Sequence, residues 1–133
     1  MVHDEWAFAC VRDLVAAWNR RDWPALESIY ARNIVYESPH SPPIMGLDAM
    51  RNWGEDLVAM VPDLQDSGLR MIANDSACGW ATFDFVQTGT LPKTFPPPDT
   101  TTRTEGAPFA VHTTMFVRFD EDGRVAKLRT AHA

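Results

Sequence analysis

The stretch "VAAWNRRDWPALESIYARNIVYESP", residues 15–39, decides the fold. Its polar run "NRRD" ends a helical pattern, Asp22 can cap a second helix, and Pro24 fits the first turn of that helix. The "NIVYES" that follows, residues 33–38, is rich in β-branched and aromatic residues and is typical of a strand. The stretch therefore predicts a helix, a turn, a short second helix and a strand, in that order.

The flanking sequence predicts two longer helices. Upstream, apolar residues recur at helical spacing over residues 4–20. Downstream, "ESPHSPPIMG" carries three prolines, which predict that the strand stops and that a stiff connection leads into a third helix. That helix begins after Gly46, and Pro62 closes it.

The second half of the chain reads as strands over about residues 68–73, 78–89, 108–119 and 124–132, with a tight turn at Asp122-Gly123. Residues 90–107, rich in Pro and Thr, form either a lid over a binding site or an irregular crossing. This order predicts an α+β fold: a cone-shaped α+β barrel in which three N-terminal helices pack on a curved mixed, mostly antiparallel sheet. Such a cone would enclose an apolar pocket.

Composition and charge narrow the functional classes. The chain has 133 residues, a net charge of −6 and no basic run longer than Arg20–Arg21, so duplex nucleic acid is not an expected partner. No apolar run approaches a membrane span, and the N-terminus lacks the basic and apolar regions of a signal peptide. A cytoplasmic protein is therefore expected, with no membrane partner and with Cys10 and Cys78 as reduced core residues.

Four stretches, together with the element order, resemble the nuclear transport factor 2-like superfamily. They are "VAAWNRRDWPALESIYARNIVYESP", "PPIMGLDAMRNW", "MVPDL" and "FVRFDEDGRV", and they are most similar to SnoaL-like polyketide cyclases and the ketosteroid isomerase group. The resemblance implies one SnoaL-like domain over residues 1–133, a lipophilic small-molecule ligand and a homodimer formed through the sheet. The superfamily holds several kinds of enzyme as well as non-enzymes, so these motifs do not specify a reaction.

The resemblance also implies where catalytic groups would lie, and this sequence departs from the pattern. The isomerase general base, an aspartate at the end of the first strand, corresponds to Ser38, with Glu37 beside it. The two oxyanion-binding positions correspond to Leu14 and to Met115 or its neighbours. SnoaL-like cyclases use an acid on the last strand, where this chain offers only His132 as a titratable group near neutrality. Steroid isomerisation by the familiar mechanism is therefore not expected.

Five residues remain as catalytic candidates, each with a simpler interpretation. His132 could be an acid/base or a surface residue at the chain end, and His40 a cavity-mouth group or a solvated loop residue. Ser38 and Tyr36 could bind a ligand carbonyl, although Tyr36 could also be a core tyrosine. Strand alternation places Glu37 on the outward face, unless a bulge turns it inward.

The same alternation predicts an apolar, aromatic cavity. Its expected substrate-binding residues are Leu14, Trp18, Trp53, Leu57, Met60, Phe83, Phe85, Gln87, Thr113, Met115 and Thr130. Asp84 and His112 should lie on the opposite face of the sheet, at the surface or in a dimer interface. No group of His, Cys, Asp or Glu has metal-ligand spacing and no glycine-rich loop suits a phosphate, so neither a metal nor a cofactor is expected.

Two functional hypotheses follow. The first is a cofactor-independent enzyme of SnoaL-like type that acts on a lipophilic cyclic or polyketide-derived small molecule by proton-transfer chemistry: cyclisation, isomerisation or dehydration. The alternative is a non-catalytic protein of the same fold that binds a small molecule or acts as a dimeric interaction module.

Overall fold

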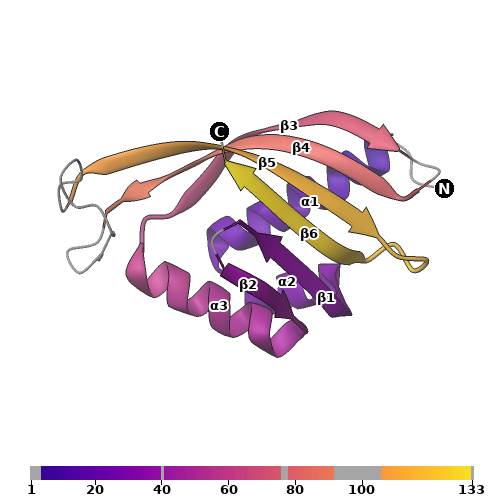
Figure 1. Cartoon of the computed structure of the whole chain (residues 1–133), viewed down its shortest axis with the longest axis horizontal. Coiled ribbons are helices and arrows are strands. Elements are labelled where there is room, and N and C mark those ends of the chain that lie inside the picture. Colours follow the sequence, from indigo (N-terminus) through magenta and orange to yellow (C-terminus); the bar gives the residue numbers. More distant parts are fainter. Residues whose placement is uncertain (1–3, 40, 76–77, 92–105, 133) are drawn as a thin grey trace.

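The computed structural model describes residues 4–39, 41–75, 78–91 and 106–132. Its helices and strands are arranged as Figure 1 shows. In chain order they are α1 (Asp4–Arg20), α2 (Trp23–Ile29), β1 (Tyr30–Ser38), β2 (Ser41–Met45), α3 (Leu47–Met60), β3 (Gln65–Asp75), β4 (Trp80–Thr90), β5 (Pro108–Phe119) and β6 (Val125–His132).

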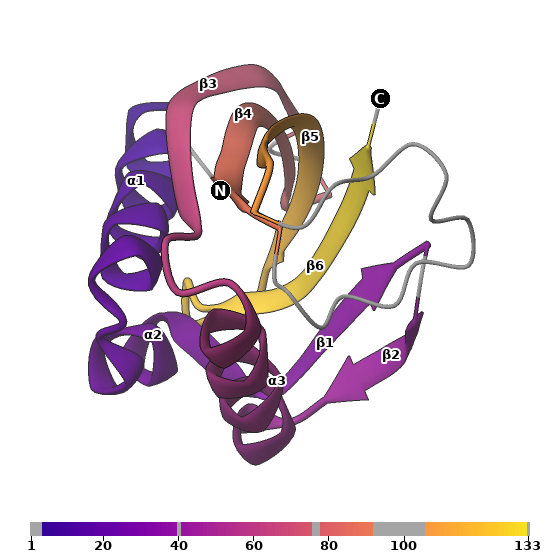
Figure 2. The ribbon, with the colours of Figure 1, turned by 90° about the vertical axis from the view of Figure 1, so that its left-hand side faces the viewer.

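The strands form one mixed sheet in the order β2-β1-β6-β5-β4-β3. β1 and β6 are parallel, and all the other neighbours are antiparallel. The sheet is strongly curved, and the three helices lie on its concave side (Figure 2). The predicted α+β class and the predicted curved, mostly antiparallel sheet are therefore confirmed.

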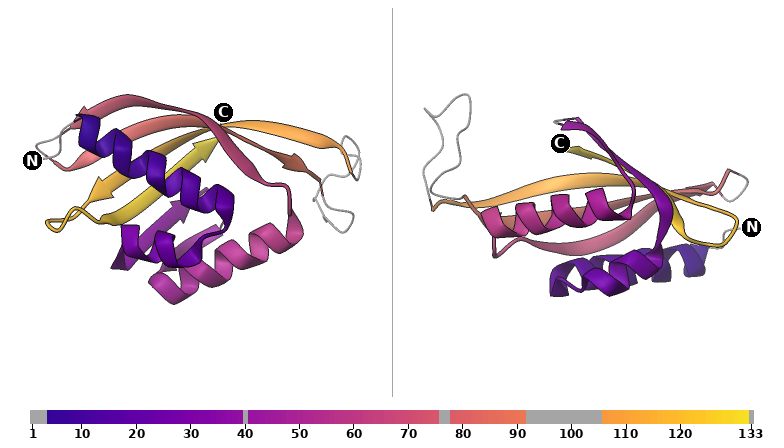
Figure 3. Two further views of the ribbon diagram at one scale, coloured as in Figure 1. Left: turned by 180° about the vertical axis from the view of Figure 1, so that it is seen from behind. Right: turned by 90° about the horizontal axis from the view of Figure 1, so that it is seen from below.

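The sheet does not close into a barrel, which corrects that part of the prediction. β2 and β3 are its two edges and do not pair with each other. Helices occupy the gap instead, because α1 packs against β3 while α3 packs against β1 and β2. Figure 3 shows α1 lying along the sheet on the side of β3, with α2 and α3 beyond its end.

Helices α1 and α2 form for the local reasons that the sequence predicts. In α1, Val11, Leu14 and Trp18 follow helical spacing and are buried on one face. The Asp22 side chain caps α2 by accepting a hydrogen bond from the backbone N–H of Ala25 at 3.2 Å.

The proline-rich connection is itself a strand, which the sequence prediction missed. β2 contains Pro42 and Pro43 and pairs only with β1. Proline has no N–H to donate, so it is tolerated at the edge of a sheet but not in its middle. The prediction was wrong because local sequence does not show that this segment would be an edge. β1 also begins earlier than predicted, at Tyr30.

The topology brings a defined set of strand ends together. β1 and β6 run in the same direction, so Tyr36 and Thr130 lie near the same end of the sheet. In the antiparallel strands, Thr113 lies near the start of β5, Gln87 near the end of β4 and Asp66 near the start of β3. The register of these strands places all three residues at that same end of the sheet. We call these five residues the polar end.

The opposite end of the interior is apolar. Val11, Phe83, Val117 and Val125 have no exposed surface there.

The fold bears on two further features of the sequence. Both cysteines are free, but Cys78 is exposed in the turn that leads into β4, so only Cys10 is partly buried as expected. Within the described part of the chain, no helix has the length and apolar character that crossing a membrane requires.

Candidate functional site

Tyr36 and Thr130 form a buried hydroxyl pair at the polar end. Their oxygens lie 2.8 Å apart between β1 and β6, and either can be the donor. Burial raises the pKa of the Tyr36 phenol, and the nearby charge of Asp66 adds to this, against the hydrogen bond from Thr130. Tyr36 is therefore a neutral hydrogen-bond donor at physiological pH.

Asp66 is the functional candidate that the sequence reasoning missed. Its carboxyl group accepts a hydrogen bond from the side-chain amide of Gln87 at 3.1 Å. Burial raises the pKa of Asp66 to about 6, although the Gln87 hydrogen bond and the charge of Arg21 oppose the rise. A carboxyl group with such a pKa can both accept and release a proton near neutral pH.

The backbone of Asp66 is fixed by the last turn of α1. The Asn19 side chain donates to the Asp66 carbonyl at 2.8 Å and accepts from the Asp66 N–H at 2.9 Å. One side chain thus satisfies both backbone groups of a residue near the start of β3. This double contact fixes the carboxyl group relative to α1.

A sequence signal for Asp66 did exist. Asp66 faces Gln87 in the register of β3 and β4, and Gln87 was already expected to face the interior. A strand predicted to start at residue 68 excluded Asp66 from that alternation. The structure starts β3 at Gln65 and accommodates Gly68, at φ 67°, within a register shift.

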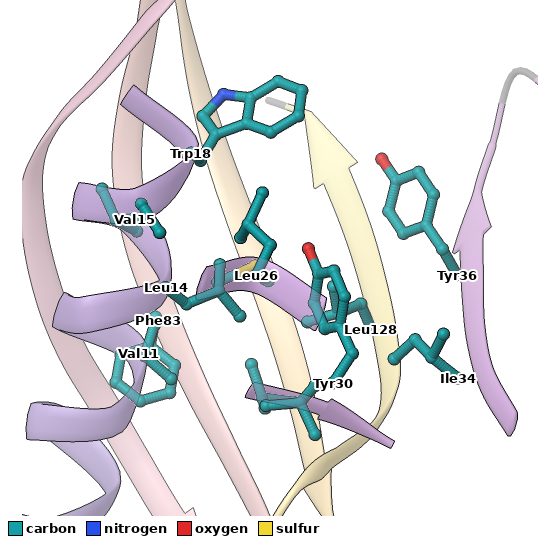
Figure 4. Close-up of a cluster of buried hydrophobic side chains, with 14 of the residues drawn as sticks. Val11, Leu14, Val15, Trp18, Leu26, Tyr30, Ile34, Tyr36, Phe83 and Leu128 are labelled. Carbon is teal, nitrogen blue, oxygen red and sulfur yellow. The ribbon is translucent and has the colours of Figure 1, made fainter. Parts of the chain in front are cut away.

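Aromatic rings form a continuous wall beside these polar groups. Trp18 stacks on Trp53 with ring centroids 5.8 Å apart, and Trp53 contacts Tyr36 at 4.8 Å. Figure 4 shows the hydroxyl groups of Tyr30 and Tyr36 and the indole nitrogen of Trp18 directed toward the same end of the cluster. Burial raises the pKa of Tyr30, and electrostatic interactions with Tyr36 and Asp66 raise it further. The three groups are therefore electrostatically coupled.

Ser38 and His132 lie at the edge of the polar end, and a hydrogen bond with Ser38 acts to lower the pKa of Tyr36. The Ser38 hydroxyl lies 3.0 Å from the Ser41 hydroxyl, at the connection between β1 and β2. His132 is exposed at the end of β6, with its Nδ1 atom 3.2 Å from the Thr113 hydroxyl. His40 lies outside the described residues.

Glu37 is on the outer face of the sheet. It forms ion pairs with Lys127 at 2.9 Å and Arg129 at 3.2 Å. Hydrogen bonds from these two cations lower the pKa of Glu37. Its chemistry is therefore that of an ionised surface group.

Most of the predicted substrate-binding residues are buried together. The buried members are Leu14, Trp18, Phe83, Phe85, Thr113, Met115 and Thr130. Trp53, Leu57 and Gln87 are partly buried. Met60 is different, because it is 41% exposed at the end of α3 and lies outside the core cluster.

The model of the SnoaL-like domain matches residues 11–128 of this chain. The chain belongs to the SnoaL-like family. No curated protein sequence matches it.

Solved structures share the fold at low sequence identity. A candidate polyketide cyclase of Xanthomonas campestris superposes with a TM-score of 0.80 at 19% identity, covering 95% of this chain and 89% of that one. A candidate isomerase of Bacillus subtilis gives 0.77 at 18%, covering 100% and 90%. AclR, a candidate hydroxylase of Streptomyces galilaeus, gives 0.69 at 22%, covering 94% and 86%. Identities this low show the fold of this SnoaL-like protein and not its reaction.

The outer face of this SnoaL-like sheet carries a separate polar cluster. Asp84 is only 7% exposed and accepts hydrogen bonds from Arg70 at 3.0 Å and from Thr114 at 2.9 Å. Burial acts to raise the pKa of Asp84, but Arg70, Thr114 and His112 together lower it. The carboxyl group is therefore held as an anion on the opposite side of the sheet from Asp66, as the alternation predicts.

A shallow recess on the helical side of the SnoaL-like fold reaches the same aromatic wall from outside. It is lined by Trp18, Trp23, Leu26, Glu27, Tyr30, Leu47, Met50, Arg51 and Trp53. Across it, Arg51 and Glu27 form an ion pair at 3.2 Å. Within the described residues, no group of three or more His, Cys, Asp or Glu side chains could hold a metal ion.

Proposed function

We propose that this SnoaL-like protein is a cofactor-independent enzyme that transfers a proton on a lipophilic cyclic or polyketide-derived carbonyl compound, in an isomerisation, cyclisation or dehydration. The observation that carries the proposal is the Asp66 carboxyl group, with its pKa of about 6, near enough to Tyr36 for its charge to raise the pKa of the Tyr36 phenol. A carboxyl group with this pKa is mostly ionised at neutral pH, as a general base must be, and is more basic than an ordinary aspartate.

The chemistry assigns a separate role to each group. The Asp66 carboxylate removes a proton from the carbon next to the substrate carbonyl, and the C–H electrons move into the carbonyl to give an enolate. The Tyr36 hydroxyl donates a hydrogen bond to the enolate oxygen, and Thr130 orients Tyr36. Where a double bond is conjugated with the enolate, protonated Asp66 returns the proton to the far carbon of the conjugated system, which completes an isomerisation. Attack by the enolate on a second carbonyl would instead close a ring, and protonated Asp66 would then give its proton to the new alkoxide.

Two residues act as positioning groups in this scheme. Gln87 holds the carboxyl group by its amide, and Asn19 holds the backbone of Asp66. The aromatic wall of Trp18, Trp53 and Tyr36 supports a lipophilic ring-containing substrate, since flat rings pack well on aromatic faces.

Hydrogen exchange on a simple ketone tests the proposal without knowledge of the natural substrate. The probe is 2-tetralone in D₂O, and NMR follows the replacement of the hydrogens next to its carbonyl by deuterium. We expect the wild-type protein to accelerate exchange and Asp66→Asn to reduce the protein-dependent rate by about 100-fold or more, the usual size of a general-base effect. Asp56→Asn, on an exposed part of α3, is the matched control and should retain the full rate.

Two outcomes would contradict the proposal. Equal rates for wild type and Asp66→Asn would remove Asp66 as the base. Binding of the ketone with no acceleration of exchange by the wild-type protein would favour the alternative, a small-molecule-binding protein of the same fold.

A homodimer formed through the sheet is also proposed. Its support is that α1, α2 and α3 lie on the concave side, so no helix of the described part of the chain covers the outer face of β3 to β6 (Figure 2). A two-fold pairing would cover this face in both copies. Sedimentation velocity tests the assembly, and a monomer at every loading concentration would contradict it.

A further inference from the structure

The indole N–H of Trp18 is a buried hydrogen-bond donor without an acceptor. Trp18 is 7% exposed, and its Nε1 atom has no hydrogen-bond partner among the residues that the structure describes. Buried polar groups in native proteins are nearly always paired, and a native exception calls for an explanation. A ligand that supplies the acceptor is one such explanation.

The ring cannot easily turn its N–H toward solvent. Trp53 stacks on it with an interplanar angle of 22°, and Trp23 packs edge-on at 6.0 Å. The Arg21 guanidinium lies 5.8 Å from the ring centroid. Gly54 completes the enclosure, because a Cβ atom there would lie only 3.1 Å from the Trp18 ring. The orientation of the N–H is therefore fixed by packing.

The N–H lies at the same end of the aromatic cluster as two tyrosine hydroxyls. The indole nitrogen is directed toward the same end of the cluster as the Tyr30 and Tyr36 hydroxyls (Figure 4). The next residue in the chain, Asn19, holds the backbone of Asp66. Trp18 is thus the immediate neighbour in α1 of the residue that holds the Asp66 backbone.

We infer that the Trp18 N–H donates a hydrogen bond to a second oxygen of the substrate, separate from the carbonyl that reacts at Tyr36 and Asp66. This inference rests on the proposed function, which makes the interior the substrate site. It narrows the substrate class to fused-ring ketones that carry a further hydrogen-bond acceptor, such as a second carbonyl or an ether oxygen. A hydrocarbon ring with a single ketone leaves the Trp18 donor unpaired.

The test uses 2-tetralones that carry a methoxy group at position 5, 6, 7 or 8, each matched by the ethyl compound. Methoxy and ethyl groups are similar in size, but only methoxy offers an acceptor oxygen. For at least one position we expect the methoxy compound to bind the wild-type protein about 2- to 10-fold more tightly, the net effect of one hydrogen bond. The preference should fall to about 1 in Trp18→Phe and persist in Trp6→Phe, the matched control, because Trp6 packs on Phe119 and not on Trp18.

NMR of the ¹⁵N-labelled indole groups gives a second measurement that does not depend on a variant's stability. The chain has five tryptophans, and the Trp18 signal is the one missing from Trp18→Phe. If that variant does not fold, triple-resonance assignment of the wild-type protein identifies the indole signal of Trp18. The preferred methoxy compound should move this indole proton downfield, and its ethyl counterpart should not.

The outcomes separate this inference from the proposed function. Equal affinities for every methoxy and ethyl pair, equal indole shifts, or no binding by any of the eight compounds would overturn the Trp18 assignment. If deuterium exchange depends on Asp66 while the Trp18 signal responds equally to both members of every pair, the proposed function stands and this inference fails. If the signal responds to methoxy alone but no exchange occurs, the opposite holds.

Discussion

Gln87 donates its side-chain amide to the Asp66 carboxyl group at 3.1 Å, and the two residues face each other across β3 and β4. The hydrogen bond stabilises the ionised carboxylate, while burial stabilises the protonated acid, and burial is the larger effect. Because burial is the larger effect, ionisation of Asp66 lowers the free energy of unfolding of the protein. Its consequences can be measured on stability as well as on activity.

Asp66→Asn should make the protein more stable at pH 8. The folded-state pKa of Asp66, about 6, lies above the ordinary value of 3.8. The protonated side chain therefore makes its whole contribution to stability below pH 3.8, and this contribution is lost as the pH rises through 6. A shift of roughly two units corresponds to at most about 3 kcal/mol. Urea unfolding at pH 8 and pH 3 measures the difference, which should vanish at pH 3. A variant less stable than wild type at pH 8 would show that Asp66 is a structural carboxylate.

Gln87→Leu should shift the pH dependence of deuterium exchange to higher pH. In the wild type, the exchange rate should rise with pH and reach half its maximum near pH 6, where Asp66 ionises. Without the amide donor the carboxylate loses stabilisation, so the midpoint moves upward. Gln65→Leu is the control, since Gln65 bonds to the carbonyl of Asn19 and not to the carboxyl group. A rate that falls with no change in midpoint would assign Gln87 a purely structural role.

Tyr36→Phe and Thr130→Val should not be additive. Each removes one half of a buried hydroxyl pair and leaves the other hydroxyl without its partner. We expect a coupling free energy of about 1 kcal/mol in a double-mutant cycle measured by urea unfolding. A coupling near zero would mean that another group satisfies the Tyr36 hydroxyl.

Gly54→Ala should destabilise the fold although alanine favours helices. A Cβ atom at residue 54 would lie 2.8 Å from the Trp23 ring and 3.1 Å from the Trp18 ring. Overpacking of this kind costs about 1–3 kcal/mol. Asn52→Ala, at an exposed position of the same helix, should be neutral or slightly stabilising. Thermal unfolding of both variants makes the comparison, and a Gly54→Ala protein as stable as wild type would show that the tryptophans can move apart.

Much of the fold followed from the sequence because it rests on local patterns. The periodicity of Val11, Leu14 and Trp18 is set by helix geometry alone, and the bounds predicted for α1 agree with the structure. The Asp22 cap is equally local. These features need no knowledge of distant parts of the chain.

The candidate site followed less well because it depends on tertiary contacts. Asp66 lies in a polar run that resembles a loop, and only pairing with Gln87 and contact with Asn19 make it part of an interior site. Its pKa is set by burial, which no local pattern encodes. The unpartnered N–H of Trp18 is likewise visible only once Trp53 and Gly54 are packed around the ring.

The two prolines of β2 also influence how copies of the chain can meet. A free sheet edge is a template for a strand of another molecule, and repeated additions at such edges build fibrils. Successive residues of a strand direct their N–H groups to opposite sides, so one of Pro42 and Pro43 gives this edge a position with no N–H to offer an incoming strand. The residues that stiffen the connection between β1 and α3 therefore also protect the protein against polymerisation through this edge.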